Sequence, residues 1–479
     1  MANNTIKFGT DGWRAIIADE FTFGNVRICA QAVADYLHDT GLSRHGIVIG
    51  FDTRFASADF ANASAEVLAG NGIKVYLSDN AVPTPVVSYS AAKLQTGGGI
   101  VITASHNPGS WNGFKFKSPD GASAPTEVVA RTEELIAKVQ TKDIHTLKLS
   151  EAIKQGLVII SDFKPAYRQQ IERLVDLEAI RRAGLKIAVD SMHGAGSGYF
   201  KMLLGEGAHC ISEIKDSPNP AFPGMQQPEP IGINLEELSE QVKSRGASVG
   251  LATDGDADRL GVIDENGNYI TQLQVYALLA LYFLEIRGER GAIVKTITTT
   301  NMLNRLGSLY NVPVFETSVG FKYVAPIMQR ENALIGGEES GGYGFRGHVP
   351  ERDGLLAGLY FLDLMARTGK TPAQLLENLY SKVGPHYYDR YDIRFAAETR
   401  QSIIQRMTDA SPASINDVAV LRKETADGFR FVLSDGSWLL VRFSGTEPLL
   451  RVYAESHSTQ PVKNLLNAGL QLAGLKDTK

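Results

Sequence analysis

The stretch HGIVIGFDTR (residues 45–54) opens the pattern that decides the fold of this chain. Its apolar run is nearly continuous, which is typical of a parallel strand that is buried on both faces. SADFANASAEVLAGNG (57–72) follows with helical character, and IKVYL (73–77) is a second β-rich run. A strand, a helix and a strand in this order predict a βαβ unit with a right-handed crossover.

The same order of elements occurs twice more along the chain. LKIAVDSMHGAGS begins the copy at 185–213, and GAIVKTITTT begins the copy at 291–316. One large doubly wound sheet is an alternative, but the wide spacing between the copies favours separate units. We therefore expect an α/β protein with three tandem mixed α/β domains, at residues 1–150, 151–260 and 261–380.

The sequence changes character after residue 380. The alternating runs VAVLRKE, FRFVL, SWLLVRF and LLRVYAE are joined through DG turns, and VKNLLNAGLQLAGL follows as a helix. Alternation with tight turns predicts an antiparallel sheet that is covered on one face. A smaller C-terminal α+β domain is therefore expected at 381–479.

Composition narrows the class of protein. The 479 residues carry a formal net charge of -5 without a basic excess, which disfavours a nucleic-acid partner. Cys29 and Cys210 are far apart and predict free thiols rather than a disulfide framework. The sequence has no apolar stretch long enough to span a bilayer, and its first residues do not resemble a secretory signal. A cytoplasmic enzyme is expected, with a large binding protein as the alternative.

Three carboxylates stand at alternate positions in LATDGDADRLGVIDENG (251–267), namely Asp254, Asp256 and Asp258. An EF-hand is excluded because Arg259 occupies the sixth position, where that loop needs glycine, and because the flanks are β-rich. The aspartyl nucleophile of the D-x-D phosphatases and a solvated acidic turn remain as alternatives. Mg²⁺ fits best, since it takes few carboxylates together with a phosphate oxygen.

Other loops carry polar groups that could bind a ligand. GGEESGGYGF (336–345) holds Glu338 and Ser340 and suits a hydroxyl-rich ligand, although alone it is equally typical of a turn. FGTDGWRA (8–15) supplies Arg14, which alone would be an ordinary surface arginine. VRFSGTEPLLR (441–451) forms a candidate phosphate cradle without the spacing of a P-loop. The cradle residues are Arg442, Ser444, Gly445, Thr446 and Arg451.

The segment GGGIVITASHNPGSWNGFK (97–115) predicts a strand, an exposed turn and a second strand, with Ser105 on a strained turn. A serine hydroxyl is a poor nucleophile without an activating base or metal. No Ser-His-Asp arrangement is visible, because His106 is adjacent in sequence. If Ser105 carries a phosphate instead, a metal and cationic side chains would neutralise its charge. Lys115 could then exchange a proton with a substrate hydroxyl, provided that burial or nearby cations lower its pKa.

Four motifs, TASHNPG, DGDADR, GEESGG and RFSGTEP, occur in this order at domain-scale intervals. Together they resemble the α-D-phosphohexomutases, the superfamily of phosphoglucomutase and phosphomannomutase, over essentially the whole chain. The resemblance implies an intramolecular phosphotransferase with the four-domain layout that the repeats predict. It also implies Mg²⁺ as the cofactor, a hexose phosphate as the substrate, and a hexose 1,6-bisphosphate as intermediate and activator.

The resemblance implies a role for each matching residue. The serine of the first motif would carry the transferable phosphate, and the lysine would serve as general base or acid. The implied catalytic residues are Ser105, Lys115, His106 and Arg14, and the implied metal ligands are Ser105, Asp254, Asp256 and Asp258. Among the implied substrate-binding residues, Glu338 and Ser340 would bind the sugar O3 and O4, and Arg259 would close the metal loop. The others are the cradle residues 442, 444, 445, 446 and 451 and, more weakly, Lys322 and His348.

The implied reaction starts from phosphoserine, which donates its phosphate to the 6-hydroxyl of a hexose 1-phosphate. The 1,6-bisphosphate then turns over in the cleft and returns its 1-phosphate to the serine, so the fourth domain is expected to close by a hinge motion. GEESGG lacks the glutamine and histidine typical of glucosamine mutases, which favours phosphoglucomutase. The alternatives are dual glucose/mannose activity, phosphoglucosamine mutase, and a catalytically inactive sugar-phosphate binding protein. We expect a monomer or a homodimer.

Overall fold

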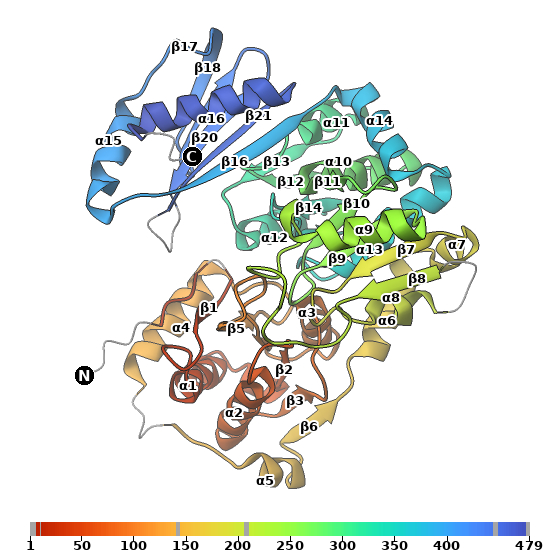
Figure 1. The fold of residues 1–479 in the computed structure, drawn as a ribbon. Helices are drawn as coiled ribbons and strands as arrows, with labels where there is room; N and C mark the ends of the chain where they lie inside the picture. Colours follow the sequence, from red (N-terminus) through yellow and green to blue (C-terminus); the bar gives the residue numbers. More distant parts are fainter. Residues whose placement is uncertain (1–5, 10, 140–143, 206–209, 444–448, 476–479) are drawn as a thin grey trace.

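The structure is a computed structural model that describes residues 6–9, 11–139, 144–205, 210–443 and 449–475. Four sheets follow one another along the chain, and each belongs to a compact unit that we call a module (Figure 1). Module I spans β1 to β6, module II α6 to β11, module III α10 to α14, and module IV β16 to α16. The first three contain parallel strands covered by helices, and the fourth is antiparallel, which confirms the predicted fold class.

Module I is built on a six-stranded sheet in the order β1-β5-β4-β2-β3-β6. Strands β4, β2, β3 and β6 are parallel, and β5 runs antiparallel to β4 and β1. Its elements are β1 (Trp13–Ile16), α1 (Phe23–Asp39), β2 (Ile47–Phe51), α2 (Ser57–Gly70), β3 (Val75–Ser78), α3 (Thr84–Lys93), β4 (Gly99–Ile102), β5 (Trp111–Lys117), α4 (Thr126–Lys138), α5 (Leu149–Lys154) and β6 (Val158–Ser161). Because β6 completes this sheet, module I extends past residue 150, where the first domain was expected to end.

Module II has a five-stranded sheet in the order β11-β10-β9-β7-β8. The predicted βαβ unit at 185–213 is present, with β7 and β8 parallel. Its elements are α6 (Lys164–Leu174), α7 (Leu177–Arg182), β7 (Lys186–Asp190), α8 (Tyr199–Leu204), β8 (Cys210–Ile214), α9 (Glu236–Arg245), β9 (Val249–Thr253), β10 (Leu260–Ile263) and β11 (Tyr269–Ile270). β11 carries this sheet beyond the expected end at residue 260.

Module III has a four-stranded sheet in the order β13-β12-β14-β15. The third predicted βαβ unit forms its parallel pair β12 and β13. Its elements are α10 (Gln272–Leu281), β12 (Ile293–Thr296), α11 (Met302–Tyr310), β13 (Val314–Thr317), α12 (Phe321–Arg330), β14 (Ile335–Gly337), β15 (Tyr343–Phe345), α13 (Gly354–Thr368) and α14 (Pro372–Val383).

Module IV is a six-stranded sheet in the order β16-β21-β20-β19-β18-β17, with antiparallel neighbours. Helices α15 and α16 cover one face, as Figure 1 shows, and the opposite face turns toward module III. Its elements are β16 (Tyr387–Arg394), α15 (Arg400–Asp409), β17 (Ser414–Ile415), β18 (Val418–Glu424), β19 (Phe429–Leu433), β20 (Trp438–Phe443), β21 (Leu449–Ser456) and α16 (Thr459–Ala473).

The apolar cores tie the modules together unequally. The largest core runs without a break through modules II and III and takes in α3 of module I. Helix α13 lies within it, and every residue from Gly354 to Met365 is buried. Module IV encloses a separate core between its sheet and its helices, and a small cluster with Trp438 and Ile297 joins it to module III. Among the described residues, we find no helix with the length and apolarity needed to cross a membrane.

Candidate active site

Ser105 lies just after β4, in a turn that Arg54, from the loop after β2, holds in place. Its φ of 52° confirms the strained turn. The Ser105 N–H donates to Thr103 Oγ1 at 2.9 Å, and Arg54 Nη2 donates to the carbonyl oxygens of Ser105 and Asn107, both at 2.6 Å. Ser105 itself is only 1% exposed, whereas residues 106–109 are partly exposed and Ser110 is exposed, so the expectation of an exposed turn fails for the serine. The reason is that module II closes over the turn: a Cβ on Gly255 would lie 2.5 Å from the Ser105 carbonyl oxygen.

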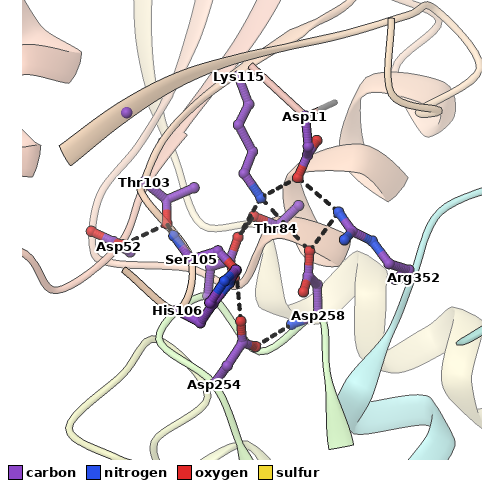
Figure 2. A network of polar contacts seen from close by, with 12 residues as sticks. Asp11, Asp52, Thr84, Thr103, Ser105, His106, Lys115, Asp254, Asp258 and Arg352 are labelled. Carbon is purple, nitrogen blue, oxygen red and sulfur yellow. Dashed lines mark hydrogen bonds and ion pairs between the residues drawn. The ribbon is translucent and has the colours of Figure 1, made fainter. Parts of the chain in front are cut away.

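Three aspartates lie in the loop between β9 and β10, and Figure 2 shows two of them, Asp254 and Asp258, near this serine. The Ser105 hydroxyl donates to Asp254 Oδ2 at 2.7 Å. One carboxylate oxygen from each of Asp254, Asp256 and Asp258 lies within 4.8 Å of the others, and all three side chains are buried. The flanking strands confirm that this loop is not an EF-hand.

The donor set of these aspartates fits a hard divalent cation. Asp256 Oδ1 and Asp258 Oδ1 are buried without a hydrogen-bond partner in the described part of the chain. Burial raises the pKa of Asp254 well above its usual value, and repulsion from the two neighbouring carboxylates adds to this. An ion with several oxygen ligands would satisfy these atoms and relieve the repulsion. The three carboxylates are therefore a candidate cation site.

Lys115 extends from β5 into the same cluster of carboxylates (Figure 2). Its Nζ lies 2.7 Å from Asp11 Oδ2, 2.8 Å from Asp256 Oδ2 and 3.7 Å from Asp258 Oδ2. Burial acts to lower the pKa of Lys115, but the three carboxylates outweigh burial and hold that pKa above its usual value. Proton exchange was expected to need a lowered Lys115 pKa, so the surroundings of this lysine differ from those expected.

Arg352, which follows β15, joins loops of three modules. Its Nη2 lies 2.7 Å from Asp11 Oδ2 in module I and 2.8 Å from Asp258 Oδ2 in module II (Figure 2). Its Nη1 lies 3.5 Å from Glu338 Oε2 in the loop between β14 and β15. Arg259, predicted to close the metal loop, has its Nε 3.9 Å from Asp258 Oδ1. Glu338 is thus one guanidinium away from the candidate cation site; we call its loop between β14 and β15 the sugar loop, after the role that the resemblance implies.

His106 and Arg14 flank the serine turn. His106 Nδ1 lies 3.4 Å from Ser105 Oγ. Burial and four nearby cations, first among them Arg259, hold the pKa of His106 well below its usual value, so the imidazole is neutral at pH 7. Arg14 Nη1 donates to Asn107 Oδ1 at 2.8 Å in the same turn.

The remaining substrate-binding candidates lie farther along module III. Glu338 is buried, and its Oε1 accepts from the Gly320 N–H at 3.1 Å. Ser340 and Lys322 are partly buried, and no contact with the serine turn is recorded for them within the described ranges. The His348 side chain is fully buried, with Nε2 3.1 Å from Asp353 Oδ2, and it stacks on Tyr89. This histidine is therefore committed to an internal contact between modules.

The two described cradle arginines lie on neighbouring strands of module IV. Arg442 and Arg451 are directly paired in the β20–β21 ladder. Arg442 Nε donates to Asp427 Oδ1 at 2.8 Å, and Arg451 Nε lies 3.8 Å from Asp392 Oδ2. The other cradle candidates lie outside the described residues; they are Ser444, Gly445 and Thr446.

Four residues that lie at this site were not predicted from the sequence, namely Asp11, Arg54, Thr84 and Arg352. Thr84 Oγ1 donates to Asp256 Oδ2 at 2.6 Å. Asp11 stood in the quoted segment FGTDGWRA, and Arg54 ends the opening stretch at the carboxyl end of a buried parallel strand, where ligand sites gather. Thr84 and Arg352 had no local signal, because their partners come from other modules.

Comparison with protein families identifies the whole chain. Four family models described as phosphoglucomutase/phosphomannomutase match in succession: α/β/α domain I at 5–143, domain II at 165–267, domain III at 272–383 and the C-terminal domain at 403–468. The order of the matches follows the four modules, although the first match ends before β6 and the fourth begins after β16.

Individual relatives cover nearly all of the chain. A phosphoglucomutase/phosphomannomutase of Thermococcus kodakarensis is 34% identical over 97% of this chain and 98% of its own length. A phosphoglucosamine mutase of Ruegeria pomeroyi is 32% identical over 94% of each chain. A crystal structure from Thermus thermophilus that carries the name phosphomannomutase has a TM-score of 0.84 and 33% identity, over 98% of this chain and 99% of that one. The chain therefore belongs to the phosphoglucomutase/phosphomannomutase family, the α-D-phosphohexomutases, and is an isomerase of the phosphohexomutase class.

Proposed function

We propose that this phosphohexomutase is a Mg²⁺-dependent phosphoglucomutase that interconverts glucose 1-phosphate and glucose 6-phosphate through phosphorylated Ser105. The observation that carries the proposal is the buried contact of Ser105 Oγ with Asp254 Oδ2 at 2.7 Å, beside the ammonium group of Lys115. In the first step the P–O bond to Ser105 breaks and a bond to the sugar 6-hydroxyl forms, giving glucose 1,6-bisphosphate. The reverse transfer from the 1-position returns the phosphate to Ser105.

The chain supplies groups for each part of this transfer. Asp254, Asp256 and Asp258 would hold Mg²⁺ together with a phosphoserine oxygen, and the ion would neutralise charge on the transferring group. Lys115 would take the proton of the sugar hydroxyl as a neutral amine, because a cation held by the three aspartates would oppose the carboxylates that raise the Lys115 pKa. Arg54 keeps the serine turn in position through its backbone carbonyl oxygens.

The sugar and the non-reacting phosphate would bind toward modules III and IV. Glu338 and Ser340 would accept and donate hydrogen bonds at the sugar O3 and O4. Arg442 and Arg451 would contact the phosphate, since paired guanidinium groups suit phosphate oxygens. The same phosphate would also contact three loop residues, Ser444, Gly445 and Thr446.

A coupled assay tests the function directly. Glucose 1-phosphate is supplied with Mg²⁺, a trace of glucose 1,6-bisphosphate and glucose-6-phosphate dehydrogenase, and NADPH formation is followed. Turnover should disappear after treatment with a chelator and return when Mg²⁺ is added. A protein without turnover at millimolar substrate would contradict the proposed function.

Substitution of the serine separates catalysis from binding. Ser105→Ala should remove nearly all turnover while calorimetry still detects glucose 6-phosphate binding, because the sugar and phosphate contacts lie in other modules. Ser110→Ala makes the same chemical change at an exposed position of the same loop and should keep normal turnover. Near-normal turnover of Ser105→Ala would rule out the phosphoserine role.

The sugar is the open part of the proposal, because relatives of similar identity bear the names of glucose, mannose and glucosamine enzymes. Mannose 1-phosphate and glucosamine 1-phosphate should be compared with glucose 1-phosphate by their kcat/KM values. The highest kcat/KM should belong to glucose 1-phosphate. A higher value for glucosamine 1-phosphate would assign the chain to the phosphoglucosamine mutases.

A further inference from the structure

The face of module IV that turns toward module III carries a row of charged side chains. Residues directly opposite each other in a ladder share one face of the sheet. Arg442 lies opposite Arg451, and Arg451 lies opposite Asp392, so these side chains form a row across β20, β21 and β16. The same face contributes Trp438 and Tyr453 to the apolar contact with module III. The two arginines are therefore on the surface that docks onto the module with the sugar loop.

A first bridge leads from Arg451 to the sugar loop. Arg451 Nε lies 3.8 Å from Asp392 Oδ2, and Asp392 Oδ1 lies 3.0 Å from Arg390 Nε. Arg390 Nη1 then donates to Glu339 Oε1 at 3.0 Å, and the Tyr388 hydroxyl donates to the same oxygen at 3.0 Å. Glu339 lies between the two residues assigned to the sugar hydroxyls. The bridge thus ends inside the sugar loop.

A second bridge leads from Arg442 to the same loop by another route. Asp427 Oδ1 accepts from Arg442 Nε at 2.8 Å, and Asp427 Oδ2 accepts from the Val319 N–H at 2.8 Å. The next N–H along the chain, that of Gly320, donates to Glu338 Oε1 at 3.1 Å. Each arginine is therefore tied through a carboxylate of module IV to one of two adjacent glutamates.

We propose that Glu339 and Asp427 are positioning residues that fix the distance between the arginine pair and the sugar loop. The inference rests on the proposed function, in which these two places bind the phosphate and the sugar hydroxyls of one ligand. If the arginine pair and the sugar loop are held apart by the length of one ligand, a ligand bound at one place reaches the other without a second encounter. The affinity for that ligand then rises although no contact is added. The pair of bridges would make the enzyme prefer hexose phosphates over free phosphate.

Burial and charge agree with a positioning role. The Glu339 and Asp427 side chains are each 19% exposed, so water screens their ion pairs only in part. The Glu339 carboxylate is the main cause that raises the pKa of Arg390 above its usual value. Because the bridges follow separate routes, loss of one leaves the contacts of the other in place.

The test compares Glu339→Ala, Asp427→Ala and the double variant, each in a Ser105→Ala background that cannot turn over. Calorimetry measures the affinity for glucose 6-phosphate and for inorganic phosphate. The double variant should bind glucose 6-phosphate about 30-fold more weakly, while its affinity for inorganic phosphate changes less than about threefold. Each single variant should bind glucose 6-phosphate less than about threefold more weakly. The binding free energy lost in the double variant should therefore exceed the sum of the losses in the two single variants.

Controls and kinetics separate positioning from general damage. Asp409→Ala removes an exposed carboxylate from α15, on the helical side of module IV, and should leave both affinities unchanged. With Ser105 intact, the double variant should show a larger change in KM than in kcat. Equal loss of both ligands, additive single effects, or unchanged glucose 6-phosphate affinity would overturn the inference. If the Ser105→Ala parent itself bound no hexose phosphate, the proposed function would fail first.

Discussion

Replacing Arg54 by methionine should unfold module I at a markedly lower temperature and disable the serine turn. The guanidinium donates to four backbone carbonyl groups, at Ser105, Asn107, Pro108 and Trp111, over 2.6 to 3.0 Å. Its Nε also lies 3.1 Å from Asp52 Oδ2, and both side chains have no exposed surface. Methionine keeps the length of the side chain but provides none of these hydrogen bonds.

The expected loss of stability follows from the Asp52 carboxylate, which the substitution leaves unpaired in the interior. Removal of one partner of a buried ion pair costs about 3–5 kcal/mol, because the remaining charge is uncompensated. A loss of 1 kcal/mol lowers the melting midpoint of a unit of 150–250 residues by about 2–4 °C. The transition that includes module I should therefore fall by about 6–20 °C.

Differential scanning calorimetry measures this shift. Arg131→Met is the matched control, because Arg131 is an exposed arginine of the same module that pairs with Asp39 and Glu134, and surface pairs contribute little. The double variant Arg54→Met/Asp52→Asn should regain part of the loss, since it removes the uncompensated carboxylate. A midpoint for Arg54→Met within about 2 °C of the control would refute the reasoning.

Two further predictions address the metal loop and the lysine. Thr84→Val removes the hydroxyl that donates to Asp256 Oδ2 at 2.6 Å and should weaken Mg²⁺ binding by roughly 10–100-fold in a calorimetric titration. Ser88→Ala on the same helix removes a hydroxyl that has no hydrogen-bond partner among the described residues, and it should leave Mg²⁺ affinity unchanged. An equal loss in both variants would contradict the role of Thr84. Gly12→Ala would place a Cβ 2.5 Å from the Phe114 carbonyl oxygen and 2.9 Å from Lys115 Cα, so kcat and thermal stability should both fall. Gly41→Ala has a similar positive φ but open space around it, and a smaller loss of stability in Gly12→Ala than in this control would count against the steric argument.

Most of the fold could be predicted because it depends on local patterns. Continuous apolar runs followed by short helices predicted the parallel pairs β2/β3, β7/β8 and β12/β13, and all three formed. Alternation predicted the antiparallel sheet of module IV. The short edge strands β6 and β11 were not predicted. They pair with β3 and β10, and the sequences of β3 and β10 do not indicate that another strand pairs beside them.

The sequence predicted the strained turn at Ser105 and the loop of three aspartates, but it did not predict the electrostatics of the site. The strained turn at Ser105 follows from its local sequence, whereas its burial comes from Gly255 in module II. The surroundings of Lys115 depend on Asp11 and on the aspartates of another module, so its raised pKa has no local signature. Arg352 was missed for the same reason, since its partners come together only when three modules pack.

The modules share their apolar cores unequally, and this affects the order in which they unfold. Modules II and III share one core with α3 of module I, whereas module IV has its own and meets its neighbour through a small cluster and a few polar bridges. Cooperative unfolding follows shared burial, so module IV should open as a separate unit at lower free energy than modules II and III, which share one core. A protease would then cut first near the start of β16, where the chain passes from the common core into module IV, and the larger fragment would stay folded.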